Sequence, residues 1–309
     1  MAKQDSKIAI FGATGHIGKN LSYYFSQDKK NDLIVFSRNK KKAQKIMKVV
    51  IPEGKYSILS YDEFENKNYK AIINCIGMGN PSLILKNNNI LEMTEFYDNK
   101  ILEYIKKKKS TIYINFSSGA IYGQNFKFPV TESTLASLDI NKFNKGSVYS
   151  ISKLYSEIKH RTMKDVKIVD LRIFNFFSRF IDLKADFLMS QISNAIIKNK
   201  KFGTDKNNII RDYIHPEDLF MIIKKCMNER KINTSFDIQS KKPIKKFDLL
   251  ESLSKNYGLR YTIERENQTS PTGLKENYYS KSRKIKKLKI TPKYSSLQTI
   301  LMELKFLIN

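Results

Sequence analysis

An apolar segment, a glycine-rich turn and a helical periodicity follow one another near the start of the chain, and this order constrains the fold more than any other feature. Residues 8–11 are apolar, and the next seven residues read Gly-Ala-Thr-Gly-His-Ile-Gly. Ile17, Leu21 and Tyr24 then recur at the spacing of one helix face. A strand that enters a helix through such a turn begins a parallel α/β sheet that binds a dinucleotide.

Each glycine of this turn has an expected role. Gly12 permits the sharp turn, Gly15 lets the backbone approach a pyrophosphate, and Gly18 lets the helix pack close to the strand. The helix N-terminus would face the phosphate charge. His16 is expected to contribute its backbone rather than its imidazole. The predicted phosphate-binding residues are Gly12, Thr14, Gly15, His16, Ile17 and Gly18.

The first half of the chain alternates short apolar runs with longer stretches of helical periodicity. Near-continuous apolar runs, such as residues 71–73 and 112–114, are typical of strands buried on both faces of a parallel sheet. The predicted strands are residues 7–11, 32–37, 56–59, 71–75, 111–117 and 167–174. The expected fold class is therefore α/β, with a doubly wound parallel sheet.

The second half of the chain is less regular. Its sequence predicts an irregular loop over residues 179–186, an amphipathic helix over 187–198 and a polar connection over 200–209. Ser295 and Gln298 form a candidate capping box, which predicts that the last helix begins there.

The formal charge of +26 is the unusual bulk property of the chain. Such a charge raises the question of nucleic acid or an anionic membrane as partner. The basic residues are mainly lysines scattered along the chain, without a zinc-finger spacing, basic heptads or an aromatic RNA-binding motif. A solvated lysine-rich surface is therefore favoured, with anionic small-molecule substrates as the alternative, and no nucleic-acid partner is expected.

Cysteine usage and hydropathy exclude other classes. Cys75 and Cys226 lie far apart and outside any CxxC spacing, so neither a disulfide framework nor a metal site is expected. No apolar run approaches the roughly 18 residues that cross a bilayer. The polar N-terminus has no signal-peptide hydrophobic region. We expect a cytoplasmic protein without membrane contact.

The end of the second predicted strand bears on the choice of cofactor. An acidic residue at this place bonds the ribose hydroxyls of NAD, whereas an arginine accommodates the 2'-phosphate of NADP. Here the strand ends in Ser37 and Arg38, with lysines close behind. We therefore predict NADP(H), and NAD(H) bound without an acidic clamp is the alternative.

A tyrosine and a lysine four residues apart suggest the chemistry. Tyr149 and Lys153 would lie on one helix face, one turn apart. Positive charge from the lysine and from an oxidised nicotinamide favours the phenolate, which makes Tyr149 a usable general acid or base. This spacing alone is common, but Ser118 follows the fifth predicted strand and presents a hydroxyl at the edge of the sheet where open α/β folds bind ligands.

Five ordered motifs together resemble the extended short-chain dehydrogenase/reductase family, and its nucleotide-sugar epimerases, 4-ketoreductases and dehydratases in particular. These motifs are the glycine turn, SSGAIYG, YSISK, LRIFNFFSR and RDYIHPEDL, and they span nearly the whole chain. The resemblance implies a Rossmann domain of residues 1–174, which also receives part of about 210–240. Residues 175–309 would mainly form a smaller substrate-binding domain.

The family's roles carry over to the matching residues. Ser118 should hydrogen-bond the reacting sugar oxygen, Tyr149 should exchange its proton, and Lys153 should hold the nicotinamide ribose. Asn175 and Arg211 match positions that contact the substrate's nucleoside diphosphate. The cofactor residues implied further along are Ser37, Arg38, Ile76, Gly77, Tyr149 and Lys153, although the segment Asn74-Cys75-Ile76-Gly77 departs from the usual apolar and alanine-rich version.

Two polar residues near these motifs are expected to be structural. Pro216 and the acidic residues after His215 are typical of a helix start, so His215 is expected to act there rather than in catalysis. Ser117 is expected to be a structural hydroxyl beside the catalytic one.

Departures from the family pattern narrow the reaction. The dehydratases carry an Asp-Glu pair directly after the catalytic hydroxyl, whereas this chain has Gly119 and Ala120. Arg38 favours exchangeable NADPH, and hence a 4-ketoreductase acting on a nucleotide sugar. The alternatives are a 4-epimerase with tightly bound NAD and a non-catalytic NADP(H) sensor. The segment 124–146 is long and could alter sugar specificity. The family often forms dimers, so a homodimer is left open by analogy.

Overall fold

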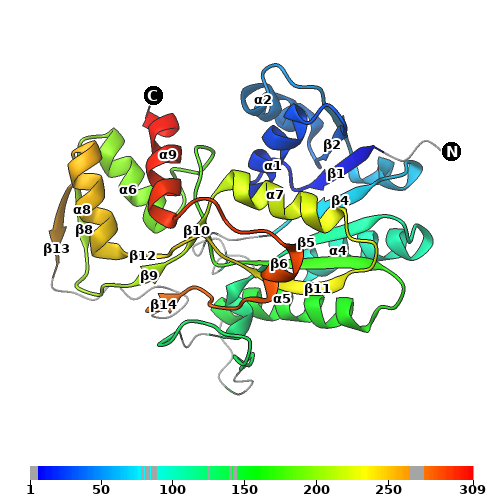
Figure 1. Ribbon diagram of the computed structural model, residues 1–309. Helices are drawn as coiled ribbons and strands as arrows, with labels where there is room; N and C mark the ends of the chain where they lie inside the picture. Colours follow the sequence, from blue (N-terminus) through cyan, green and yellow to red (C-terminus); the bar gives the residue numbers. More distant parts are fainter. Residues whose placement is uncertain are drawn as a thin grey trace.

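A seven-stranded parallel sheet forms the centre of the larger part of the molecule (Figure 1). The computed structural model describes residues 6–77, 80, 84, 89–123, 126–138, 141, 145–264 and 275–308. The strand order is β11-β6-β5-β4-β1-β2-β3, and every adjacent pair is parallel. The strands are β1 (Lys7–Phe11), β2 (Asp32–Phe36), β3 (Ser57–Leu59), β4 (Ala71–Asn74), β5 (Ile112–Ser118), β6 (Lys167–Ile173) and β11 (Asn233–Ile238).

Helices cover both faces of this sheet, because successive strand residues point to opposite sides. Ile8 and Ile10 of β1 join one apolar cluster, while Ala9 and Phe11 join another. The first cluster is covered by α1 (His16–Gln27), α2 (Lys40–Val50) and α7 (Pro216–Met227). The second is covered by α4 (Ile90–Lys107), and α5 (Lys145–Thr162) packs beside α4. The predicted doubly wound α/β sheet is confirmed.

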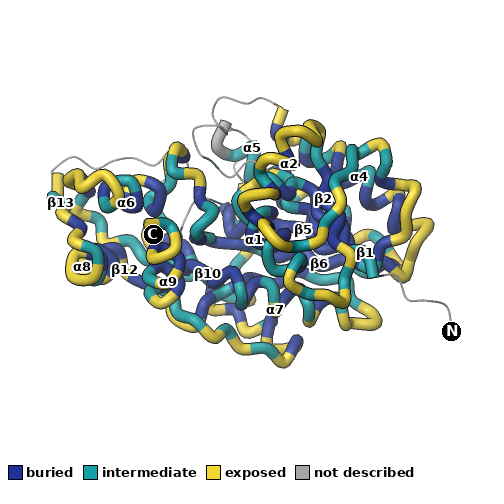
Figure 2. The backbone as a smooth tube through the Cα atoms, turned by 90° about the horizontal axis from the view of Figure 1, so that it is seen from above, coloured by how far each residue is buried: buried dark blue, intermediate teal, exposed yellow. Residues whose placement is uncertain are grey.

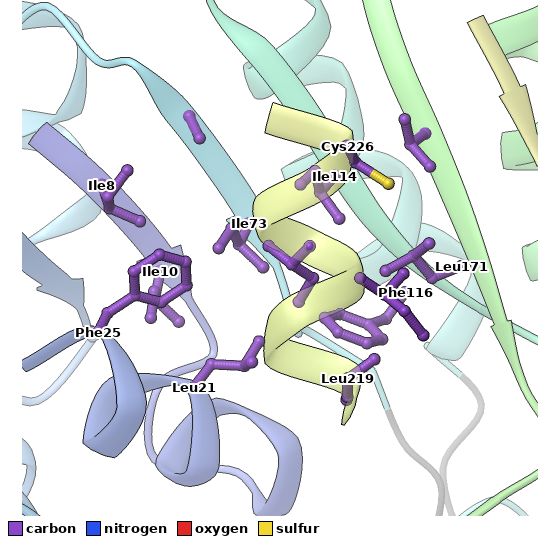
Figure 3. Packing of buried hydrophobic residues seen from close by; sticks show 14 of the residues in the cluster. Ile8, Ile10, Leu21, Phe25, Ile73, Ile114, Phe116, Leu171, Leu219 and Cys226 are labelled. Carbon is purple, nitrogen blue, oxygen red and sulfur yellow. The ribbon is translucent and has the colours of Figure 1, made fainter. Parts of the chain in front are cut away.

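The first cluster shows how late parts of the chain return to the sheet. Leu219 and Cys226 of α7 are fully buried against strand residues such as Ile114 and Leu171 (Figure 3). Figure 2 shows the central strands as buried, with exposed residues along the outer helices and loops. The apolar core therefore lies in the middle of the sheet and leaves the strand ends for polar groups.

The remaining elements gather beside one end of the sheet, where α6, α8 and α9 share a separate apolar cluster (Figure 1). Ser295 and Gln298 exchange the two hydrogen bonds of a capping box, as predicted for the start of α9. These elements are α6 (Leu188–Ile197), α8 (Lys246–Tyr257), α9 (Ser296–Ile308), β7 (Asn175–Phe176), β8 (Lys201–Thr204), β9 (Ile210–Arg211), β10 (Tyr213–Ile214), β12 (Ile244–Lys245), β13 (Arg260–Ile263) and β14 (Asn277–Tyr278). The described residues also contain three 3-10 helices: η1 (Tyr61–Asn66), η2 (Gly119–Tyr122) and η3 (Lys284–Leu288).

One prediction for this second half is wrong. Residues 200–209 are not wholly a polar connection, because they contain β8, which pairs in parallel with β13. Phe202 is buried in the apolar cluster that α6, α8 and α9 share, whereas Lys201 is exposed. Phe202 is therefore the one large apolar residue that the strand buries. Its partner strand lies far along the chain, and no local pattern reveals that pairing. Among the described helices, none is long and apolar enough to cross a membrane.

Candidate active site

The glycine turn has the geometry that its sequence predicts at two positions. Gly12 has a φ of +70°, and a Cβ there would lie 2.8 Å from the carbonyl carbon of Cys75. A Cβ on Gly18 would collide with the Gly12 carbonyl oxygen, so α1 packs directly on the turn. Gly15 is the N-cap of α1 and supplies no side-chain hydrogen bond to its first turn. The first amides of α1 are thus left to a ligand, which fits a phosphate group.

The loop after β4 lies next to this turn and carries Ile76 and Gly77. The Asn74 side chain accepts a hydrogen bond from the Ile76 N–H at 3.0 Å and donates to the Tyr113 hydroxyl at 3.0 Å. Gly77 is exposed, and a Cβ there would lie 3.3 Å from Lys153 Nζ. Of the two residues predicted to border the cofactor, Ile76 therefore lies against the turn and Gly77 lies next to Lys153.

At the end of β2, Ser37 is half-buried and Arg38 is exposed. The sequence reasoning missed Tyr61, which connects this edge to the glycine turn. Its hydroxyl accepts from the Gly12 N–H and donates to the Phe36 carbonyl, both at 3.3 Å. Burial raises the pKa of Tyr61 to about 12, so this phenol stays protonated.

Ser118, Tyr149 and Lys153 come together at the carboxyl end of β5. Ser118 is the last residue of the strand, and its hydroxyl accepts a hydrogen bond from the Ala120 N–H at 3.1 Å. The Ser118 hydroxyl also hydrogen-bonds Tyr149 of α5. Lys153 is buried, and its ammonium donates to the Phe116 carbonyl of β5 at 2.8 Å. The strand thus contacts both functional groups of the helix.

The electrostatics of this trio suit proton transfer. Burial raises the pKa of Tyr149, and the hydrogen bond from Ser118 offsets part of that rise. Burial lowers the pKa of Lys153, while the carboxylates of Asp98 and Asp170 act in the opposite direction. Tyr149 is therefore protonated at neutral pH, which is the state that a general acid requires.

Asn175 and Arg211 lie in the short strands β7 and β9, in the part of the chain that follows the trio. The Asn175 amide donates to the Asp212 carbonyl at 3.3 Å, next in sequence to Arg211. The Arg211 guanidinium donates to the carbonyl of Lys275 at 2.6 Å. Within the described residues, neither Arg211 nor Lys275 pairs with a carboxylate. Burial, and then the charge of Arg211, lowers the pKa of Lys275 to about 8.

Tyr278 is the residue that joins these groups, and sequence reasoning missed it together with Lys275. Its hydroxyl lies 3.3 Å from Ser118 Oγ, and its carbonyl accepts from the Asn175 amide at 3.5 Å. Its ring centroid is 4.6 Å from Lys275 Nζ and 5.9 Å from Arg211 Cζ. It follows a segment without apolar periodicity, so only the pairing of β14 with β9 could have indicated its position.

The two histidines considered in the sequence are engaged by protein groups. The His16 imidazole lies 2.8 Å from Ser178 Oγ, and burial lowers its pKa to about 3. The His215 ring accepts a hydrogen bond from the Glu217 N–H and is the N-cap of α7, as predicted. Ser117 donates to Glu157 at 2.5 Å, which agrees with its predicted structural role.

The position after Ser118 has no room for an acidic side chain. A Cβ on Gly119 would lie 2.5 Å from the ring of Phe174, and Ala120 is buried. An Asp-Glu pair of the dehydratase kind could not be placed here without moving that ring. The geometry therefore agrees with the absence of the pair from the sequence.

Residues 8–238 match the family described as the NAD dependent epimerase/dehydratase family. The chain belongs to this family. Membership confirms the resemblance to the extended short-chain dehydrogenases/reductases and the prediction of a nicotinamide-dependent enzyme. The match includes the glycine turn, the Ser118, Tyr149 and Lys153 trio, and the return of the chain to β11. Among curated proteins, none matches the sequence significantly.

Solved structures resemble the chain over its whole length. A UDP-N-acetylglucosamine 4-epimerase from Methanobrevibacter ruminantium, in complex with UDP-N-acetylmuramic acid, has a TM-score of 0.81 at 17% identity and covers 99% of both chains. UDP-glucose 4-epimerase from Thermotoga maritima, with UDP-glucose, has a TM-score of 0.76 at 17% identity and covers 97% of this chain and 98% of its own. dTDP-glucose 4,6-dehydratase from Bacillus anthracis, in complex with NAD, has a TM-score of 0.76 at 16% identity and covers 97% of this chain and 96% of its own. These likenesses support the fold.

Proposed function

We propose that the protein reduces a 4-keto sugar carried on a nucleoside diphosphate, with NADPH as the hydride donor and Tyr149 as the general acid. The observation that carries the proposal is the meeting of Ser118, Tyr149 and Lys153 at the end of β5, beside the uncapped start of α1. A bound nicotinamide supplies the hydride. Ser118 then orients the ketone oxygen, and Tyr149 delivers the proton that this oxygen needs as it becomes a hydroxyl.

The cofactor assignment rests on charge at the end of β2. Arg38 is exposed, so its guanidinium is accessible to a 2'-phosphate. The turn residues 12–18, together with Ile76 and Gly77, would hold the rest of the dinucleotide, and Lys153 its nicotinamide ribose. NAD(H) is the alternative cofactor, since the solved relatives include complexes with NAD.

The substrate assignment rests on two cations without acidic partners among the described residues. Arg211 and Lys275 lie together, and the pKa of Lys275 is lowered by its partial burial and by the charge of Arg211. A diphosphate would neutralise both groups. Asn175 would add a neutral donor. We assign residues 1–174, with part of about 210–240, to a dinucleotide-binding domain. Residues 175–309 would mainly form the substrate-binding domain, which contains Asn175, Arg211 and Lys275.

A 4-epimerase with tightly bound NAD is the second candidate, and the similarity to solved 4-epimerases favours it. The two reactions differ in hydride balance. A reductase consumes one NADPH for each sugar, whereas an epimerase returns the hydride to the same sugar and consumes none. The dinucleotide that copurifies is therefore informative: retained NAD would favour the epimerase.

The test supplies both types of substrate. A 4-keto nucleotide sugar, formed from dTDP-glucose by a 4,6-dehydratase, should drive stoichiometric oxidation of NADPH. UDP-glucose should remain unchanged at carbon 4. Epimerisation of UDP-glucose without net NADPH oxidation would replace the first candidate by the second. Tyr149→Phe should lower the turnover at least about 100-fold because it removes the proton donor.

Tyr155→Phe is the matched control, since this tyrosine lies on the same helix with its side chain 43% exposed. It should turn over like the wild type. An unchanged rate in Tyr149→Phe would remove the catalytic assignment, and the absence of any reaction with either nucleotide sugar would contradict both candidate functions.

A further inference from the structure

The hydroxyl of Tyr278 is fixed against Ser118 by its surroundings. The residue belongs to β14, whose backbone pairs with Arg211 of β9, so the strand sets its height over the site. Its ring packs against Phe126 and Phe174, with centroids 4.7 and 5.1 Å away. The side chain is buried, and the phenol oxygen lies 3.3 Å from Ser118 Oγ. A second phenol, besides that of Tyr149, therefore stands at Ser118.

The hydrogen-bonding capacity of Ser118 is limited to one proton and two lone pairs. The Ala120 N–H occupies one lone pair at 3.1 Å. Tyr278 stays protonated because burial raises its pKa, an effect that Ser118 opposes and the neighbouring Tyr149 reinforces. Either oxygen of the Ser118–Tyr278 pair can be the donor, and donation by Tyr278 would place its proton on the remaining lone pair of Ser118. Both lone pairs of Ser118 are then filled.

We propose that Tyr278 is a positioning residue: it donates its proton to the last lone pair of Ser118 and so leaves the single Ser118 proton for Tyr149 or, when substrate is bound, for the reacting oxygen. A serine hydroxyl without this partner could equally accept a hydrogen bond from Tyr149. With the partner it can only donate, and donation favours the phenolate over the phenol. The inference rests on the proposed function only in taking Tyr149 as the group that exchanges a proton.

Tyr278→Phe tests this direction because it removes the hydroxyl and keeps the ring. The freed lone pair lets Ser118 accept from Tyr149, which stabilises the protonated form. The preference of Ser118 for donating to Tyr149 is worth about one neutral hydrogen bond. Its loss should raise the pKa of Tyr149 by about half to one pH unit. Ser118→Ala removes the shared oxygen itself and should raise this pKa at least as far.

The readout is fluorine NMR of protein labelled with fluorotyrosine, which needs neither substrate nor turnover. The Tyr149 resonance is assigned by its absence from Tyr149→Phe, and its shift is followed against pH. The midpoint should rise in Tyr278→Phe, and adding this change to Ser118→Ala should have no further effect, since Tyr278 acts through Ser118. An unchanged midpoint in Tyr278→Phe would overturn the proposal. A further rise in the double variant would also overturn it, because Tyr278 would then act on Tyr149 directly.

Tyr279→Phe provides the control, because Tyr279 is the next residue along the chain, is only half-buried and has its pKa raised by burial and by the Asp212 carboxylate. Its variant should leave the Tyr149 midpoint unchanged, and equal thermal unfolding of all variants shows that the fold is kept. The outcome is separate from that of the proposed function. If no nucleotide sugar is turned over, the titration still decides whether Tyr278 directs the Ser118 proton.

Discussion

Replacing Gly12 by alanine should damage the dinucleotide site far more than the same change at another left-handed glycine. Gly12 has a φ of +70° and Gly258 a φ of +65°, so both backbones are strained for a residue with a Cβ. Their surroundings differ. A Cβ at Gly258 meets nothing within 4 Å, whereas at Gly12 it would lie 2.8 to 2.9 Å from backbone atoms of Cys75 and Ile76. The pair therefore separates conformational strain from collision.

The expected free energies follow from these two contributions. The left-handed backbone costs a residue with a Cβ about 1–2 kcal/mol, which is the whole effect at Gly258. At Gly12 the contacting atoms are main chain that cannot rotate away, and forced overpacking adds about 1–3 kcal/mol. Gly12→Ala should thus lower the free energy of unfolding by roughly 2–5 kcal/mol, a large share of the roughly 5–15 kcal/mol of a typical domain.

The dinucleotide affinity supplies the second measurement. Relief of the collision must move the turn away from Ile76, and the amides of α1 would move with it. A loss of about 1.4 kcal/mol in binding is a tenfold weaker Kd, and Gly12→Ala should lose at least that much. Gly258→Ala should bind as the wild type does.

Two assays check these values. The chain has no tryptophan, so urea unfolding is best followed by far-ultraviolet circular dichroism, and NADPH binding by the fluorescence of its nicotinamide. Equal destabilisation of the two variants, or an unchanged NADPH Kd in Gly12→Ala, would refute the reasoning from backbone contact.

Three further predictions concern cofactor choice, pH and assembly. Arg38→Ala should raise the KM for NADPH and leave that for NADH unchanged, and unaltered preference in steady-state kinetics would contradict the role of this cation. Burial would lower the pKa of His160, but Asp170 and Asp98 outweigh it and raise the pKa to about 9. Since this folded value exceeds the unfolded 6.5, the imidazolium should stabilise the fold by about 3 kcal/mol below pH 6.5 and lose this contribution as pH rises through 9. Urea midpoints of wild type and His160→Gln should therefore converge at high pH. Ile158→Asp, on a side chain that is 56% exposed on α5, should weaken a homodimer built on this helix, as sedimentation equilibrium would show.

The glycine turn was predictable because its requirements are local. The left-handed turn at Gly12 and the close packing at Gly18 follow from the order strand, turn and helix, and the structure has both. The order of the motifs also identified Ser118, Tyr149 and Lys153, which lie together as expected. The turn could be predicted from a few neighbouring residues, and the trio from the resemblance of its motifs to a known family.

Tyr278 and Lys275 could not be found in this way. Ser118 and Tyr278 are 160 residues apart, and only the pairing of two-residue strands brings them within hydrogen-bonding distance. A cation without a partner is likewise invisible in a sequence that contains 56 lysines and arginines. The sequence reasoning also passed over His160, whose polar neighbours come from other elements.

Helix α5 shows why this last omission matters. Apolar periodicity predicts how most helices pack, yet the inner face of α5 buries Ser156, Glu157 and His160 together with Lys153. Glu157 forms an ion pair with Arg172, and the His160 ring lies between two carboxylates. Such buried ion pairs are often no more stabilising than well-packed apolar residues of the same volume would be, but each has one productive geometry. They can therefore set the rotation and register of α5 on the sheet more narrowly than apolar contacts would, and Tyr149 needs that register to meet Ser118.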